Sequence, residues 1–321
     1  MKSTSALTDF YYTELYDSLS ELEKEREGVR RNVLILFFIV GGIALLIIGI
    51  IYANCHCFNE SFIWIGVAGT AVGGFGYRML VSGYRSGFKE KIIRPLIGAI
   101  EEGLHYAPDA MVPQTLFEFS QLFDQRVDRY RGNDFVRGQI DGIALQFSDV
   151  HAERRSRDSK GREHWSTIFR GLFVVADFNK HFKGRTLVLP DLAENLFGSF
   201  IGGMLQSRNF TKDQLVRMDD PAFEKAFVVY GSDQIEARYI LTHTMMERLL
   251  KLKKETGSNI FVAFKGEKIL IAVDYKKDLF EPTVFSSLLS IEQAMDYIRT
   301  LKSTIGIVEE LKLNEKLWSK I

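Results

Sequence analysis

The hydrophobic positions divide the chain into an apolar part near the N-terminus and a longer part of mixed character. From Val33 to Ala53 the sequence contains 21 residues without a charge, and a second, glycine-rich apolar run extends from Phe62 to Val81, with Arg78 near its end. A helix of 21 residues is about 31 Å long, which matches the hydrocarbon thickness of a bilayer. The pattern therefore predicts two membrane-spanning helices, at 33–53 and 62–81.

The connection between the two runs is short. Only eight residues, 54–61, join them, so the spans are expected to form an antiparallel transmembrane hairpin over residues 33–83. Small residues allow the backbones of two membrane helices to approach each other closely. The glycines expected at such a contact are Gly42, Gly49, Gly66, Gly69 and Gly73.

Basic residues predict the orientation of this hairpin. Lys and Arg side chains precede the first run and follow the second, whereas residues 54–61 contain none. Cytoplasmic flanks of membrane helices are enriched in Lys and Arg. Both termini are therefore expected in the cytoplasm, with residues 1–32 as a cytoplasmic amphipathic helix and residues 84–321 as a cytoplasmic domain that begins with a stalk helix at 84–105.

Apolar residues also recur at helical spacing outside the spans. Leu15, Leu19 and Leu22 form part of such a stripe near the N-terminus, and a comparable stripe runs from Ile291 to Val308. Three arrangements fit these stripes: the two helices pack on each other, on copies in a neighbouring subunit, or each on the core of its own domain.

Between these helices the pattern changes to that of β-strands. Asp141-Gly142 separates two strand-like runs, and Asp-Gly tolerates the positive φ of a tight turn. The sequence predicts antiparallel sheets flanked by helices, an α+β fold. The expected strands are 134–140, 143–150, 165–178, 185–189 and 226–230, with a hairpin at 259–274 around Gly266; the expected helices are 190–206 and 234–254.

Composition excludes several functions. The chain has 41 basic and 41 acidic side chains. A nucleic-acid-binding protein normally has a basic excess, so no nucleic-acid partner is expected. Both cysteines, Cys55 and Cys57, lie between the predicted spans, which excludes thiol catalysis and cysteine zinc sites from the cytoplasmic domain. No glycine-rich phosphate loop occurs, and no cofactor is expected.

A group of polar residues is the one candidate for catalysis. His151 and Glu153 fall on the same face of a predicted strand, and His164, Asp177 and His181 follow. Such residues bind metals, so a metal-assisted hydrolase is the alternative function. Scattered polar residues at hairpin ends are more often a solvated surface.

A basic turn is the more informative feature. Five basic residues and one acid occupy positions 154–162. Near a cytoplasmic leaflet, each Lys or Arg contributes about 1 kcal/mol to binding of anionic lipid; an acidic partner protein would be attracted in the same way, and a solvated turn that protects a sheet edge is the plain alternative. The basic residues are Arg154, Arg155, Arg157, Lys160 and Arg162.

Two ordered blocks carry a family resemblance. FRGLFVVADFNKHFKGRTLVLP at 169–190 and FEKAFVVYGSDQIEARYILT at 223–242 resemble the signature blocks of a bacterial membrane-protein family, domain of unknown function 3137. The resemblance implies an inner-membrane protein and supplies no activity or catalytic residue. The expected function is a membrane-anchored interaction or ligand-binding domain, not an enzyme, whose partners are membrane lipid and a protein partner or a second copy of the chain.

Overall fold

The protein consists of two compact units. The structure, a computed structural model, describes residues 3–55, 60–191, 213–275, 278 and 280–306. The helical unit combines Lys2–Ala99 with Phe280–Ile298, and the sheet unit combines Ile100–Leu279 with Arg299–Ile321. Each unit therefore combines segments that are separated in the sequence.

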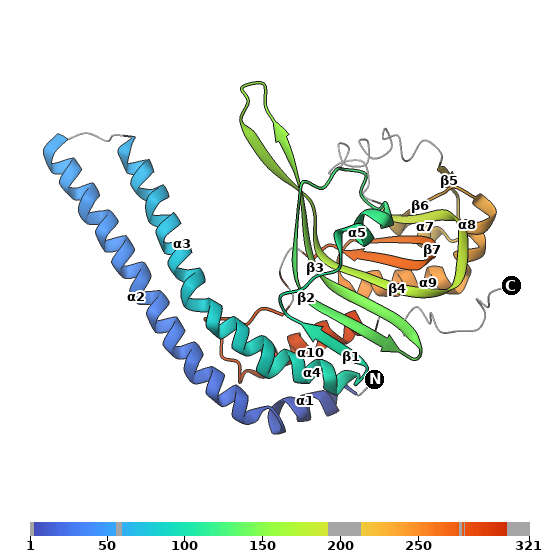
Figure 1. Ribbon diagram of the computed structural model, residues 1–321, viewed down its shortest axis with the longest axis horizontal. Helices are drawn as coiled ribbons and strands as arrows, with labels where there is room; N and C mark the ends of the chain where they lie inside the picture. Colours follow the sequence, from blue (N-terminus) through green and yellow to red (C-terminus); the bar gives the residue numbers. More distant parts are fainter. Residues whose placement is uncertain (1–2, 56–59, 192–212, 276–277, 279, 307–321) are drawn as a thin grey trace. The chain divides into compact units, whose positions relative to one another are not determined.

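Long helices form most of the helical unit (Figure 1). Ser3 caps the first helix, since its hydroxyl accepts a hydrogen bond of 3.1 Å from the backbone N–H of Ala6. The helices are α1 (Thr4–Thr13), α2 (Tyr16–Cys55), α3 (Ser61–Phe88), the π-helical turn η1 (Lys89–Ile93) and α4 (Arg94–Ile100).

The first predicted span is confirmed as a long apolar helix. Among the described residues, α2 is the one helix long and apolar enough to cross a membrane, and none of its most apolar window is buried. Its exposed side chains include Phe38, Leu45 and Leu46. Exposure of so many apolar side chains to water would be unfavourable, so α2 is suited to a lipid environment.

The second predicted span is also helical, as part of α3, and it packs on α2 through glycine. A Cβ atom on Gly69 would lie 3.6 Å from the side chain of Val40, and one on Gly73 would lie 3.5 Å from Phe37. The closest approach is at Gly76, where a Cβ atom would collide with Leu36. The expected role of Gly42, Gly49 and Gly66 is not observed, because no neighbour lies within 4 Å of a Cβ atom placed there.

Residues 280–298 form hydrogen bonds with α1 and with the N-terminal part of α2, away from the contact between α2 and α3 at Gly69 and Gly73. The Tyr11 hydroxyl donates to the carbonyl of Leu288 at 3.1 Å, and the Arg26 guanidinium donates to the carbonyl of Val284 at 2.8 Å. The Glu23 carboxylate accepts from the N–H of Leu288 at 2.9 Å. The Thr8 hydroxyl also donates to the sulfur of Met295, in α10 (Ile291–Ile305), at 3.4 Å. Of the arrangements open from the sequence, the structure thus shows the N-terminal helix packed on the C-terminal one.

The sheet unit contains one antiparallel sheet with seven described strands, which confirms the α+β fold (Figure 1). The order is β1-β2-β3-β4-β6-β5, and β7 also pairs with β4. The strands are β1 (Leu104–Ala107), β2 (Arg129–Ile140), β3 (Ile143–Arg157), β4 (Glu163–Pro190), β5 (Gln214–Val216), β6 (Phe227–Gly231) and β7 (Ile260–Val273). Because β4 has 28 residues, it pairs with three strands along its length.

Helix α5 (Gln114–Ser120) covers part of one face of this sheet over an aromatic core. The ring of Phe117 lies 5.3 Å from that of Phe123 and 5.2 Å from that of Phe173, measured between centroids. Phe169 belongs to the same buried cluster. The aromatic strand 169–178 therefore contributes to the hydrophobic core. The remaining helices of the unit are α7 (Pro221–Ala226), α8 (Gln234–Ile240) and α9 (His243–Thr256).

The local predictions have mixed outcomes. The turn at Asp141-Gly142 is confirmed, with φ of 49° and 81°. The hairpin at 259–274 is wrong: β7 is one strand that pairs with β4 from Val262 to Val273, and Gly266 lies at a register shift in that pairing. The helix at 234–254 is interrupted because the Thr242 side chain caps a new helix, α9. The helix predicted from Pro190 lies outside the described residues from position 192 onward.

Candidate binding surface on the β3–β4 ribbon

A two-stranded ribbon extends beyond the rest of the sheet (Figure 1). The last residue pair between β2 and β3 is Arg129–Glu153, whereas β3 continues to pair with β4 as far as Arg157 and Glu163. We call residues 154–166 the ribbon. Apart from Asp158, all its side chains are exposed, so this segment has no core and its surface chemistry determines what it can bind.

The tip of the ribbon is formed by local hydrogen bonds. The Asp158 carboxylate accepts from the N–H groups of Lys160 and Arg162, both at 2.9 Å. Gly161 adopts a positive φ of 78°. The hydrogen bond from the Arg162 backbone holds the pKa of Asp158 below its usual value. The turn is therefore specified by its own sequence and keeps a charged carboxylate at neutral pH.

Two acidic residues neutralise part of the basic charge. Arg155 and Arg157 contact Glu163 at 3.1 and 2.8 Å, and Arg162 contacts Asp158 at 3.2 Å. The hydrogen bond from Arg157 lowers the pKa of Glu163. The ribbon contains five basic residues and two acidic residues, so its net charge is +3. The second acidic residue, Glu163, lies one position beyond the basic run at 154–162.

Two of the five basic side chains remain unpaired. Within the part of the chain that the structure describes, Arg154 and Lys160 form no ion pair. Arg154 lies opposite Ser166, and Lys160 is in the turn. These two residues are therefore fully available to an anionic partner.

The base of the ribbon contains residues that sequence analysis missed. The guanidinium of Arg129 lies 3.7 Å from the centroid of the Trp165 ring, a cation–π contact, and the side chain of Trp165 is 39% exposed. Arg131 contacts Glu153 at 2.6 Å. Burial opposes ionisation of Glu153, but His151 and the two arginines lower its pKa. The two arginines come from β2, and strand pairing brings them to Glu153 on β3 and Trp165 on β4, which no local sequence pattern reveals.

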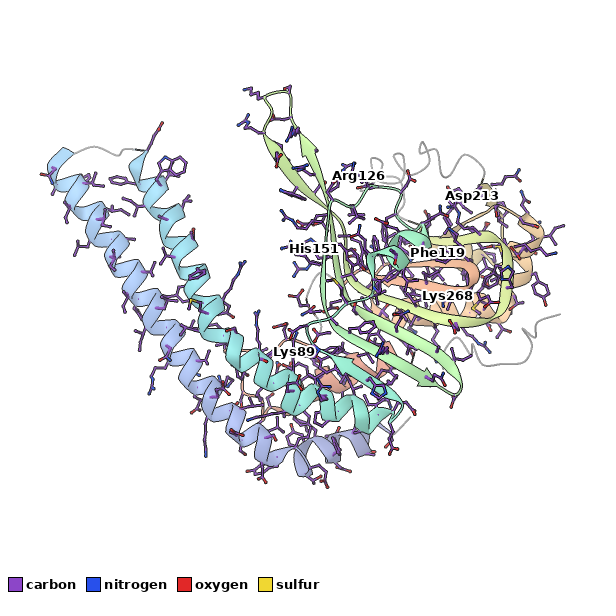
Figure 2. All side chains as sticks on the ribbon, viewed as in Figure 1. Lys89, Phe119, Arg126, His151, Asp213 and Lys268 are labelled. Carbon is purple, nitrogen blue, oxygen red and sulfur yellow. The ribbon has the colours of Figure 1, made fainter. Side chains whose placement is uncertain are left out.

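The predicted polar group does not form one site. His151 lies near the base of the ribbon (Figure 2), 4.0 Å from Glu153 and 3.1 Å from the hydroxyl of Thr167, and its burial lowers its pKa. His164 contacts Asp158 at 3.4 Å at the tip. Asp177 instead contacts Lys268 at 2.7 Å, and His181 lies 3.7 Å from Glu267.

Distance along the strand explains this separation. His151 lies opposite Arg170 on β4, and seven residues of strand from there to Asp177 span about 23 Å. No group of three or more His, Cys, Asp or Glu side chains that could hold a metal ion occurs among the described residues. The five residues of the predicted group therefore take part in four separate polar contacts.

Comparisons with known proteins found one matching family, for the second half of the chain, and one similar solved structure. Residues 167–313 match the model of the family described as protein of unknown function (DUF3137), which confirms the family resemblance of the sequence. No curated protein matches the chain. The crystal structure of the mycobacterial trehalose monomycolate transport factor A, TtfA, is similar over 68% of this chain and 94% of that chain, with 12% sequence identity and a TM-score of 0.35.

Proposed function

Given that residues 167–313 belong to the DUF3137 family, whose description includes no activity, we propose that this chain is a membrane-anchored protein that binds anionic lipid headgroups through its ribbon. The observation that carries the proposal is the ribbon itself: all its side chains but Asp158 are exposed, its net charge is +3, and two of its basic side chains have no ion-pair partner among the described residues. Catalysis is not part of the proposed function.

The anchor would consist of two spans in a bacterial inner membrane, with both termini in the cytoplasm. Beyond the long apolar helix α2, the exposed side chains of α3 include Ile63, Trp64, Phe75 and Met79. Apart from Tyr16 at its start, the large exposed apolar residues of α2 run from Leu34 to Tyr52, and those of α3 run from Ile63 to Met79. Each interval is roughly 17–19 residues, or about 25–29 Å of helix. The flanking basic residues support the orientation.

Lipid is a better match to the ribbon than a folded protein. The arginines occupy both faces of a narrow ladder, since Arg154 and Arg155 are neighbours on one strand. A stable protein interface needs an apolar, shape-complementary centre. The ribbon offers one large exposed apolar side chain, Trp165, which is too little for such a centre. Headgroups need no fixed shape, and Trp is favoured at membrane interfaces.

Vesicle binding in trans tests this proposal with the full-length chain. The protein is held in neutral phosphatidylcholine nanodiscs, and vesicles with or without phosphatidylglycerol are added and floated. We expect binding to anionic vesicles only, and loss of that binding when the five basic residues of the ribbon are replaced by Gln.

A charge-matched control removes the effect of net charge. It replaces five exposed basic residues elsewhere in the sheet unit by Gln, and it should bind like the wild type. Equal binding by the ribbon variant and the wild type would contradict the proposal, and would favour an acidic protein as the ribbon's partner. The control positions are Arg217, Lys225, Arg238, Lys254 and Arg299.

A further inference from the structure

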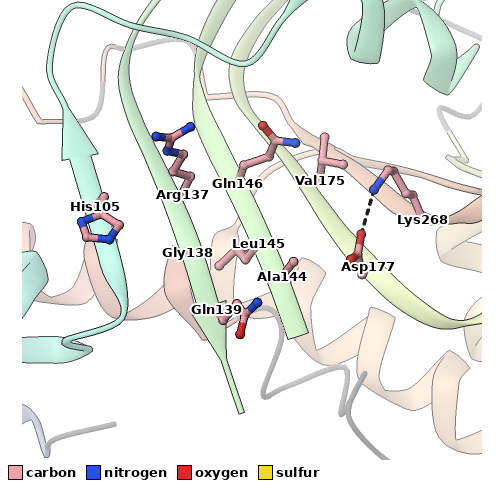
Figure 3. A pocket seen from close by; sticks show the side chains of 10 residues that line it. All are labelled: His105, Arg137, Gly138, Gln139, Ala144, Leu145, Gln146, Val175, Asp177 and Lys268. Atoms are coloured by element: carbon pink, nitrogen blue, oxygen red, sulfur yellow. Dashed lines mark hydrogen bonds and ion pairs between the residues drawn. The ribbon is translucent and has the colours of Figure 1, made fainter. Parts of the chain in front are cut away.

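A second candidate site lies on the sheet itself, at the end of the core that α5 covers. His105, Arg137, Gln146 and Val175 lie opposite one another on β1, β2, β3 and β4. Val175 is 2% exposed and belongs to the core cluster. Beyond it the polar side chains line an open pocket of about 460 Å³ (Figure 3), which lies within the size range of small-ligand sites.

The hydrogen-bonding groups in this pocket are largely uncommitted. In the described part of the chain, Arg137 has no carboxylate partner, and Gln139 and Gln146 form no side-chain hydrogen bond. Asp177 and Lys268, at the opposite side of the pocket, are paired at 2.7 Å (Figure 3). The pocket thus combines an unpaired guanidinium, two free amides and a carboxylate that can still accept a hydrogen bond.

The chemistry of these groups defines a ligand class. A guanidinium binds phosphate or carboxylate through two parallel hydrogen bonds, and glutamine and aspartate side chains accept hydrogen bonds from hydroxyl groups. Arg137 and Asp177 are separated by two strand spacings and two residues along the strand, about 12 Å between Cα atoms. With the side chains extending inward, this distance suits a molecule the size of a phosphorylated or acidic monosaccharide.

We propose that this pocket binds a small polyol that carries one anionic group, with Arg137 binding the anion and Gln139, Gln146 and Asp177 binding hydroxyl groups. The site is separate from the ribbon, and it does not depend on lipid binding. His105 borders the pocket on β1 and adds a further hydrogen-bonding group beside Arg137.

Calorimetric titration of the full-length protein in neutral nanodiscs tests the site. The probes are glucose 6-phosphate and glucuronate, with glucose and inorganic phosphate as partial ligands. At least one of the two probes should bind about tenfold more tightly than either partial ligand, since one charged hydrogen-bonded contact accounts for such a factor. Binding of both probes no tighter than inorganic phosphate would overturn the proposal.

Two variants identify the anion-binding residue. R137Q should lose at least about tenfold in affinity, and R137K, which keeps the charge without the bidentate geometry, should fall between R137Q and the wild type. R126Q, which changes a highly exposed arginine outside the pocket, serves as the control and should bind like the wild type. R137Q binding with unchanged affinity while retaining the wild-type circular dichroism spectrum would overturn the role of Arg137.

Discussion

The ribbon allows one quantitative prediction about lipid binding. In the double variant R154Q/K160Q, the two ribbon side chains that have no ion-pair partner in the described part of the chain lose their charge. The tip turn should persist, because it depends on the Asp158 carboxylate and on backbone N–H groups. The change therefore removes attraction to lipid while leaving the shape of the ribbon intact.

The expected size follows from the charges removed. Each Lys or Arg near an anionic membrane contributes about 1 kcal/mol, so the double variant should lose about 2 kcal/mol, roughly 30-fold in vesicle affinity. Flotation of phosphatidylglycerol vesicles at low salt measures this ratio. At about 1 M salt the Debye length falls to about 3 Å, and the difference should disappear. Wild-type affinity in the variant, or a deficit that persists at high salt, would refute the electrostatic account.

Three further predictions test other parts of the account. E163Q releases Arg155 and Arg157 from their shared partner and should raise anionic-vesicle affinity about fivefold; weaker binding would show that Glu163 positions the arginines. R26M removes a buried ion pair and should destabilise the helical unit by about 3 kcal/mol, measured by thermal denaturation in detergent. Although burial opposes ionisation of Glu23, the Arg26 and Leu288 hydrogen bonds lower its pKa below 4.5. The wild type should therefore lose this stabilisation as the pH falls below 4.5, and R26M should show a smaller loss, because the Leu288 hydrogen bond remains. A membrane-impermeant maleimide should label Cys55, the last residue of α2, and Cys57 in intact spheroplasts; labelling only after lysis would contradict the proposed orientation.

Local sequence patterns predicted the elements that depend on local physics. The apolar helix α2 follows from an uninterrupted run of hydrophobic residues, and the β2–β3 turn follows from Asp141-Gly142. The single strand β7 could not be recognised in this way. Gly266 is typical of a turn, but pairing with β4 keeps the chain extended on both sides of it.

Contacts between distant segments were beyond the reach of the sequence. Nothing in positions 280–290 indicates that their carbonyl groups accept hydrogen bonds from Tyr11 and Arg26. At the ribbon, the basic residues were visible, whereas the neutralising role of Glu163 and the contact between Arg129 and Trp165 depend on strand register. The polar residues at 151–181 are close in sequence but are divided between β3 and the 28-residue strand β4.

Direct contact between the ribbon and lipid is the central claim. An environment-sensitive fluorophore on S159C, at the exposed tip and in a background with both native cysteines replaced by Ser, reports this contact in nanodiscs. The account predicts a blue-shifted emission with reduced acrylamide quenching in discs containing phosphatidylglycerol or on addition of such vesicles, reversed at about 1 M salt. Identical emission with neutral and anionic lipid would contradict it.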